Sequence, residues 1–203
     1  MKPFNWINHL EPAKGPPPNS TVSFLKWSLS GSFKILSLSG MLSILTGITE
    51  VSAVLLLGLL IDAALNSSVD NPLGNNVFLF SAGLMFFLLV RPIIFGCSSY
   101  MQSVIVTPNI FNLVLSRIHR WCIGHSIPFF ENDFAGRIAQ KEMQTARAVT
   151  DVVVEILQTV LFALASLIGA ALMLLSVNIT LAIALIIWLV FYIFLIGYFM
   201  PII

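Results

Sequence analysis

Few residues of this chain have the types and spacing that chemistry requires. The three histidines, His9, His119 and His125, have no companions at the spacing of metal ligands. No Ser-His-acid or Cys-His arrangement suggests a nucleophile. No lysine is followed by serine or threonine, so the phosphate-binding pattern G-x-x-x-x-G-K-[ST] is absent. The sequence therefore predicts no catalytic, metal-binding or cofactor-binding residue, and the chain is not expected to be an enzyme by itself.

Two charged residues stand inside long apolar runs. Glu50 is the only charge in residues 35–61, and Arg91 is the only charge in residues 76–116. An ionisable group within a bilayer is costly, by about 2.5–3.5 kcal/mol for Arg or Asp at a helix centre, and usually faces a cavity or a partner. Glu50 and Arg91 could line a substrate path or form a mutual ion pair, and Arg91 could instead extend to the interface. The structural interpretation, pairing or extension, is preferred.

The composition defines the class of protein that must position these residues. The chain has 203 residues, of which 58% are hydrophobic and 9% charged, and its mean hydropathy is +0.96. Soluble chains carry roughly 25% charged residues. The formal net charge of +1 argues against nucleic acid as a partner. The sequence therefore predicts a multispanning membrane protein that contacts the lipid bilayer.

Long apolar runs place the membrane crossings. A helix needs about 20 apolar residues to cross a hydrocarbon core of about 30 Å. Runs at about 35–65, 76–122, 137–176 and 179–203 predict four crossings, of which the last two form an antiparallel hairpin around residues 176–178. The expected fold is an all-α membrane protein with four long transmembrane helices, an N-terminal interfacial helix and one short transverse element between the second and third crossings.

Basic residues predict the orientation. Positive charge accumulates on the cytoplasmic side, and the loops at 66–75 and 176–178 have none. Nine of the ten basic residues precede the first crossing or lie between the second and third: Lys2, Lys14, Lys26, Lys34, Arg117, Arg120, Arg137, Lys141 and Arg147. Both termini are therefore expected in the cytoplasm, with residues 1–21 as a cytoplasmic tail. Residues 22–30 are either an interfacial helix or the frayed start of the first crossing.

The segment between the second and third crossings departs from a simple loop. The second helix extends to about residue 123, nearly 50 residues or roughly 70 Å, and its two prolines, Pro92 and Pro108, are expected to kink it rather than end it. Gly124 and Pro128 are expected to break the helix, and Gly136 to break it again. The phenylalanines between them are too apolar for water. They either dock on a cytoplasmic partner, the preferred interpretation, or pack back onto the two long helices.

These features in this order resemble the first intracellular loop of type I ABC exporters. The resemblance is carried by residues 127–132 (IPFFEN), residues 136–138 (GRI) and residues 58–62 (GLLID) near the end of the first crossing. It implies that residues 22–203 are part of an exporter transmembrane domain, whose short transverse element is the first coupling helix. The implied docking residues are Ile127, Pro128, Phe129, Phe130, Phe134 and Gly136.

The resemblance also implies partners. Each exporter half has six crossings and a nucleotide-binding domain that uses ATP and Mg²⁺, and two halves, identical or different, make a transporter. The chain ends within what would be the fourth helix, so a truncated or split exporter half is expected, in a bacterial inner membrane. The alternative is a stand-alone four-helix membrane scaffold or assembly protein without transport activity.

Overall fold

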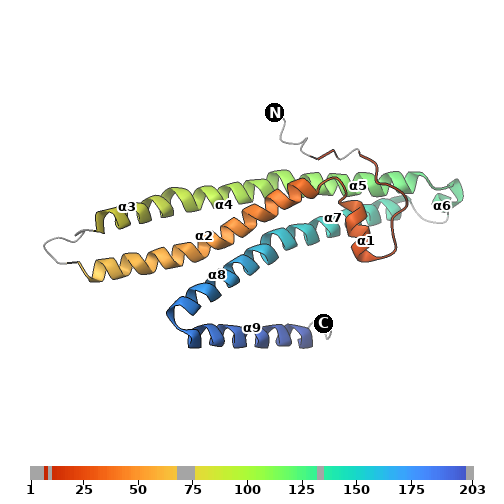
Figure 1. Ribbon diagram of the computed structural model, residues 1–203. Helices are drawn as coiled ribbons and strands as arrows, with labels where there is room; N and C mark the ends of the chain where they lie inside the picture. The colour runs from red at the N-terminus through yellow and green to blue at the C-terminus, as the bar shows by residue number, and fades with distance from the viewer. Residues whose placement is uncertain (1–6, 9–10, 68–75, 132–134, 200–203) are drawn as a thin grey trace. The chain divides into compact units, whose positions relative to one another are not determined.

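The computed structural model describes residues 7–8, 11–67, 76–131 and 135–199, and every regular element within these ranges is helical. Four helical runs are long and apolar enough to cross a membrane: Phe33–Leu65, Val77–Ile123, Gly136–Val177 and Ile179–Phe199. Figure 1 traces them in chain order. They confirm the prediction of an all-α membrane protein with four long helices.

The first and fourth runs are the single helices α2 (Phe33–Leu65) and α9 (Ile179–Phe199), whereas the other two are composite. In the second, π-helical turns at Phe86–Val90 and Met101–Val106 join α3 (Val77–Met85), α4 (Arg91–Tyr100) and α5 (Thr107–Ile123). In the third, a π-helical turn at Ile156–Val160 joins α7 (Ala135–Glu155) and α8 (Leu161–Val177).

The second run continues through both of its prolines because a widened turn precedes each of them. A proline ring in a regular α-helix clashes with the carbonyl four residues earlier and removes a donor. Before Pro108, the backbone N–H of Thr107 instead reaches the carbonyl of Gln102, five residues back. The Thr107 hydroxyl donates to the same oxygen at 2.9 Å. The π-helical turn gives the ring room, so the helix does not end.

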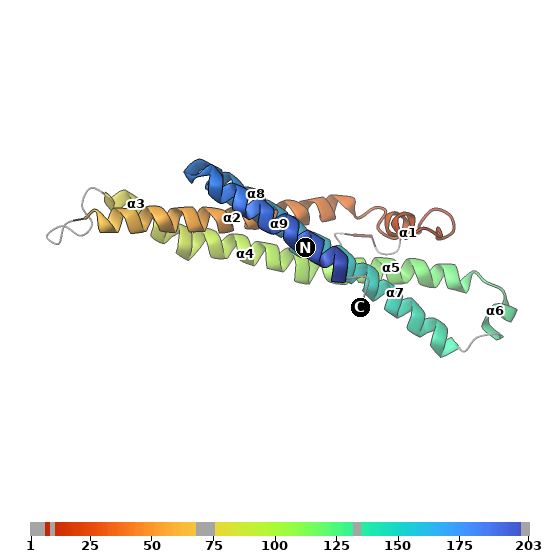
Figure 2. The ribbon, with the colours of Figure 1, turned by 90° about the horizontal axis from the view of Figure 1, so that it is seen from below.

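The N-terminal segment forms a separate short helix, α1 (Thr21–Ser28). A turn at residues 29–32 divides it from α2, and Gly31 occupies this turn with a φ of +86°, a backbone conformation that favours glycine. α1 is therefore a helix of its own and not the frayed start of α2. Figures 1 and 2 show it crossing α5 steeply.

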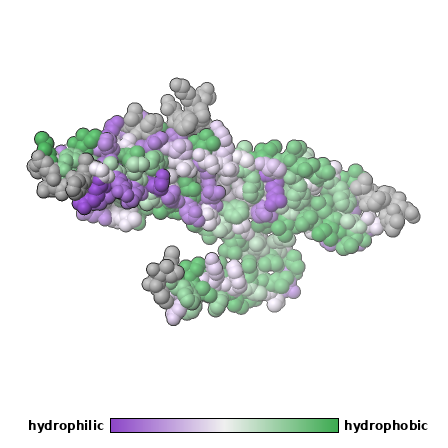
Figure 3. All heavy atoms as spheres, turned by 180° about the vertical axis from the view of Figure 1, so that it is seen from behind, coloured by the Kyte–Doolittle hydropathy of each residue, from purple (hydrophilic) through white to green (hydrophobic). Residues whose placement is uncertain are grey.

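Packing divides the chain into two units. Unit 1 contains the described residues of Met1–Thr46 and Pro92–Phe162, and unit 2 those of Gly47–Arg91 and Ala163–Ile203. In unit 1, hydrophilic side chains gather over α5, α7 and the N-terminal segment (Figure 3). In unit 2, large apolar side chains are exposed along α8 and α9, as expected of helices that face lipid.

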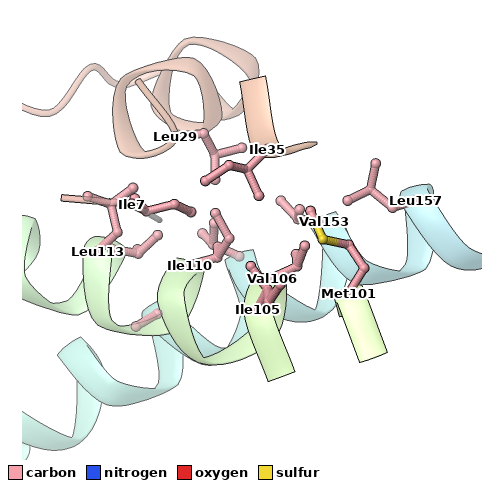
Figure 4. Close-up of a cluster of buried hydrophobic side chains, with 13 residues drawn as sticks. Ile7, Leu29, Ile35, Met101, Ile105, Val106, Ile110, Leu113, Val153 and Leu157 are labelled. Carbon is pink, nitrogen blue, oxygen red and sulfur yellow. The ribbon is translucent and has the colours of Figure 1, made fainter. Parts of the chain in front are cut away.

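The core of unit 1 lies where α5 packs along α7. Val106, Ile110, Leu113 and Val114 are at most 1% exposed and recur at three- and four-residue steps, so they form one stripe on the helix. Figure 4 shows side chains from α7 and from the N-terminal segment converging on this stripe. The buried members of the cluster from these neighbouring segments are Ile7, Leu29, Ile35, Ala146, Val149, Val153 and Leu157. Ile7, in the segment expected to be a cytoplasmic tail, is thus part of the core.

Small residues allow the helices of unit 2 to approach closely. A Cβ atom on Gly83 of α3 would lie 2.7 Å from Leu60 Cδ1, and one on Gly169 of α8 would lie 3.0 Å from Val51 Cγ2. Between α8 and α9 the chain reverses at Asn178, as the hairpin prediction requires. The Asn178 Oδ1 atom accepts the backbone N–H of Thr180 at 2.8 Å and caps the start of α9.

The unit 1 core predicts a measurable loss on truncation. Ile110→Ala removes a fully buried side chain and is expected to lower the free energy of unfolding by about 2–5 kcal/mol. Ile193→Ala, at a 60% exposed position on α9, is the matched control. Both are measured by denaturation in detergent micelles. Equal losses for the two variants would contradict a stabilising core at Ile110.

Candidate docking site

The break after α5 builds a short transverse helix. α5 ends at Ile123, and the N–H of His125 turns back to the carbonyl of Cys122 at 3.1 Å. The next helix, α6 (Ile127–Glu131), holds Pro128 in its first turn. A proline is tolerated there because first-turn N–H groups have no helical acceptor. Gly124 therefore marks the break as expected, whereas Pro128 belongs to the helix that follows.

The expected second break at Gly136 is wrong. α7 begins at Ala135 and includes Gly136 in its first turn. A glycine costs less at this position than in a helix interior, since helical N-termini fray and their N–H groups are unpaired in any case. No heavy atom lies within 4 Å of the place that a Cβ on Gly136 would take.

Aromatic side chains link the end of α5 to α6. The cluster consists of Trp121, His125, Phe129 and Phe130, hereafter the aromatic cluster. The His125 ring lies 5.3 Å from Trp121 and 4.6 Å from Phe129, and Phe129 lies 5.2 Å from Phe130, all between ring centroids. His125 Nδ1 is 3.0 Å from the carbonyl oxygen of Trp121, which orients the imidazole.

This cluster leaves apolar surface uncovered. Phe129 remains 40% exposed and Ile127 74% exposed, whereas Phe130 is half-buried. Phe129 therefore packs on the neighbouring aromatic rings and still presents part of its ring outward. The side chain of Pro128 and all of Phe134, which the sequence also assigned to docking, lie outside the described parts of the structure.

An acid–imidazole contact joins α5 to α7 near this end. His119 Nδ1 on α5 lies 3.0 Å from Glu142 Oε2 on α7, and Glu142 is buried, with 8% exposed. The contact ties together the two helices that carry α6 between them. The sequence does not reveal the pair, because its members are 23 positions apart and meet only through the register of two packed helices.

Arg117 is the buried charge that sequence analysis treated only as a basic loop residue. It is 3% exposed. Its Nη1 donates to the carbonyls of Trp27 at 3.1 Å and Ser28 at 2.9 Å. Its Nη2 donates to Ser30 at 2.8 Å, and its Nε to Glu11 at 3.3 Å.

Two of these four carbonyls, those of Trp27 and Ser28, lie at the C-terminal end of α1, where the regular helical hydrogen bonds end and a cation is favourable. Arg117 thus fastens α1 and the chain before it to α5, one helical turn before Trp121. The sequence does hold one signal for the burial of Arg117, its position in the helical repeat. Residue 117 follows Ile110, Leu113 and Val114 on the buried stripe of α5.

The two isolated charges of the apolar runs meet in unit 2. Arg91 Nη2 lies 2.9 Å from Glu50 Oε2 and 3.1 Å from Glu50 Oε1. Their side chains are 38% and 37% exposed. Of the alternatives left open by the sequence, the structure has the mutual ion pair, in which each charge supplies the partner that an apolar environment demands.

Comparison with known proteins gives one distant relative. The chain is 25% identical over 193 residues to an ABC transporter ATP-binding protein of Haemophilus influenzae, described as uncharacterised. The match covers 95% of this chain and 30% of the relative, so the chain spans less than a third of the relative's length. No family model and no solved structure matches. The chain is therefore similar to part of an ABC transporter component.

The Arg117 contacts predict that a lysine cannot replace the arginine at position 117. A lysine ammonium lacks the planar fork that reaches four carbonyls at once. Arg117→Lys is expected to lower the free energy of unfolding by about 2 kcal/mol and to make residues 11–30 sensitive to limited proteolysis. Arg120→Lys, one turn on and exposed, is the control. Unchanged proteolysis of the Arg117→Lys protein would show that the fork does not hold α1.

The Glu50–Arg91 pair predicts mutual rescue. Glu50→Arg or Arg91→Glu alone places like charges together, and each unpaired charge costs about 2.5–3.5 kcal/mol in a bilayer. Each single variant is therefore expected to reduce the membrane-inserted fraction roughly tenfold or more, measured as chain resistant to alkaline extraction. The double swap is expected to restore most of it. A double variant no better than the worse single one would remove the pair as a contributor.

Proposed function

We propose that this chain is the N-terminal transmembrane part of an ATP-driven ABC exporter half. In this proposal residues 22–203 form part of the transmembrane domain and of the substrate path, and α6 is a coupling helix. The observation that carries the proposal is the exposed apolar surface of Ile127 and Phe129 on a short helix between two long ones.

Helix length supports a position for α6 outside the lipid. The run Val77–Ile123 has 47 residues, about 70 Å along the helix at 1.5 Å per residue. A hydrocarbon core of about 30 Å takes less than half of that. The α5 and α7 segments nearest α6 also carry exposed charges, including Arg120 and Lys141.

Apolar groups displayed among such charges are not covered by lipid, and a protein partner is the occupant that would bury them. The basic residues that flank α6 favour the cytoplasmic side for it and for both termini. The sequence holds no G-x-x-x-x-G-K-[ST] pattern, so in this proposal the partner supplies the site where ATP and Mg²⁺ bind.

The distant relative supports the identity of that partner. It is named as an ATP-binding protein, and the larger part of its length has no counterpart here. We therefore expect a nucleotide-binding domain, carried on a continuation of this chain or on a separate subunit, to dock on α6 and bind ATP and Mg²⁺. A second half, identical or different, would complete the transporter, and a bacterial inner membrane is the expected location.

A stand-alone membrane scaffold is the second candidate. The extensive core between α5 and α7 and the anchored α1 favour it, because they give unit 1 a packed structure in the absence of a partner. A scaffold has no requirement for an apolar surface at Phe129, whereas a coupling helix has. The two candidates therefore differ in the effect of one substitution.

The exporter proposal predicts that Phe129→Asp weakens docking. The probe is the purified part of the Haemophilus influenzae relative that this chain does not match, captured by full-length chain in nanodiscs. A desolvated aromatic contact typically contributes more than 1 kcal/mol, so capture affinity is expected to fall roughly tenfold. Met143→Asp, at a 53% exposed apolar position of α7, should leave it unchanged. Equal capture by wild type and both variants would favour the scaffold.

A further inference from the structure

Polar side chains gather around a cavity within unit 1, although most of the surface that lines it is apolar. Its volume is about 430 Å³, and residues of α2, α4, α8 and the π-helical turn Ile156–Val160 line it, leaving it open on one side. Six uncharged polar side chains line it: Ser43, Thr46, Ser98, Ser99, Gln158 and Thr159. Polar groups in such segments are costly without partners, so their convergence on one space points to a ligand.

The lining offers both acceptors and donors. The Ser43 hydroxyl donates to the Ser39 carbonyl at 3.2 Å, and the Thr46 hydroxyl to the Leu42 carbonyl at 2.7 Å. Because these protons are engaged within α2, the two oxygens face a ligand as acceptors. Gln158 and Thr159 form no side-chain hydrogen bond within the described part of the chain. The Gln158 amide can therefore give two donors and one acceptor.

Two buried polar atoms lie one helical turn from lining residues, although their own side chains do not line the cavity. Ser39 Oγ and Gln102 Nε2 have no hydrogen-bond partner among the described residues, although their side chains are 1% and 4% exposed. Ser39 precedes Ser43 by one helical turn, and Gln102 follows Ser98 by one turn. Such orphaned groups are rare in folded proteins and need an explanation, which a bound polar molecule or its water would supply.

The π-helical turn at Ile156–Val160 also coincides with the cavity. The other two π-helical turns precede prolines, whereas this one has no proline to account for it. Its consecutive residues Gln158 and Thr159 both line the space. π-helical turns occur frequently at functional sites, and here the widened turn brings two neighbouring polar side chains to one cavity.

The absence of charged side chains from the lining favours an uncharged ligand. No ionisable side chain among the described residues lines the cavity. A charged ligand would lose its hydration here without gaining a counter-ion, which is a large penalty in an apolar environment. Two aromatic rings, Phe95 and Phe162, complete the wall and offer an apolar face.

We propose that this cavity binds an uncharged amphipathic molecule, with a flat apolar portion against Phe95 and Phe162 and hydrogen-bonding groups toward Gln158 and Thr159. The claim that the cavity binds such a molecule does not depend on the proposed function. The claim that this molecule is transported rests on the proposed function. The molecule would then belong to the class of substrate that the exporter moves.

Dansylamide tests the proposal, because it is a neutral naphthalene sulfonamide whose emission rises on leaving water. The matched control probe is dansylate, which has the same ring system and a negative charge. Full-length chain in nanodiscs is titrated with each probe. We expect saturable dansylamide binding, with dansylate roughly tenfold weaker or more. Thr159→Val and Gln158→Leu should each weaken dansylamide binding roughly two- to tenfold, the range for one lost hydrogen bond.

Thr180→Val, at an exposed position of α9 outside the cavity, is the matched control and should bind as wild type does. Equal binding of the two probes would overturn the proposal. So would non-saturable partitioning, or a signal that follows the lipid-to-protein ratio and ignores Thr159→Val, since lipid would then occupy the cavity. Phe129→Asp protein should bind dansylamide normally. The titration requires no nucleotide-binding domain, so its outcome is separate from that of the capture experiment.

Discussion

A chain that crosses hydrocarbon must pair its own backbone N–H and carbonyl groups, because lipid offers no hydrogen bonds in exchange. Much of the local structure follows from this requirement. Long helices satisfy it along most of the chain, and the exceptions are handled individually. Before Pro108, the carbonyl of Gln102 accepts hydrogen bonds from the backbone N–H of Thr107, through a π-helical turn, and from the Thr107 hydroxyl. At Asn178, a side-chain oxygen caps the first turn of α9.

Buried backbone carbonyls also need partners outside the lipid, which explains why a charge is buried at the end of α1. The last carbonyls of that helix have no helical partner, and the Arg117 guanidinium provides several donors in one rigid plane. These hydrogen bonds also hold α1 against α5, the helix whose end carries part of the aromatic cluster. The His119–Glu142 contact then ties that helix to α7. The exposed rings of the aromatic cluster therefore lie at the end of two helices, α5 and α7, that are held together by this contact.

The proposed function depends on surfaces and spaces rather than on reacting groups. The chain contains no phosphate-binding loop, and the described residues hold no group of histidines, cysteines and acids suited to a metal ion. The described residues offer an apolar projection at α6 and, in unit 1, a cavity lined by uncharged polar side chains and two aromatic rings. In the proposed exporter, the first would receive the movement of an ATP-binding partner and the second would hold the molecule to be moved.

The amino-acid sequence by itself determined the class, the four long helices, the break after α5 and the reversal at Asn178. Each of these depends on local composition, because an apolar run or a turn residue acts within a few positions of itself. The partner of Glu50 and the burial of Arg117 and Ile7 were decided only by the tertiary structure. So were the contact between His119 and Glu142 and the convergence of six polar side chains on one cavity. Such contacts depend on which helix faces meet, and every π-helical turn rotates the following face by an amount that hydropathy does not record.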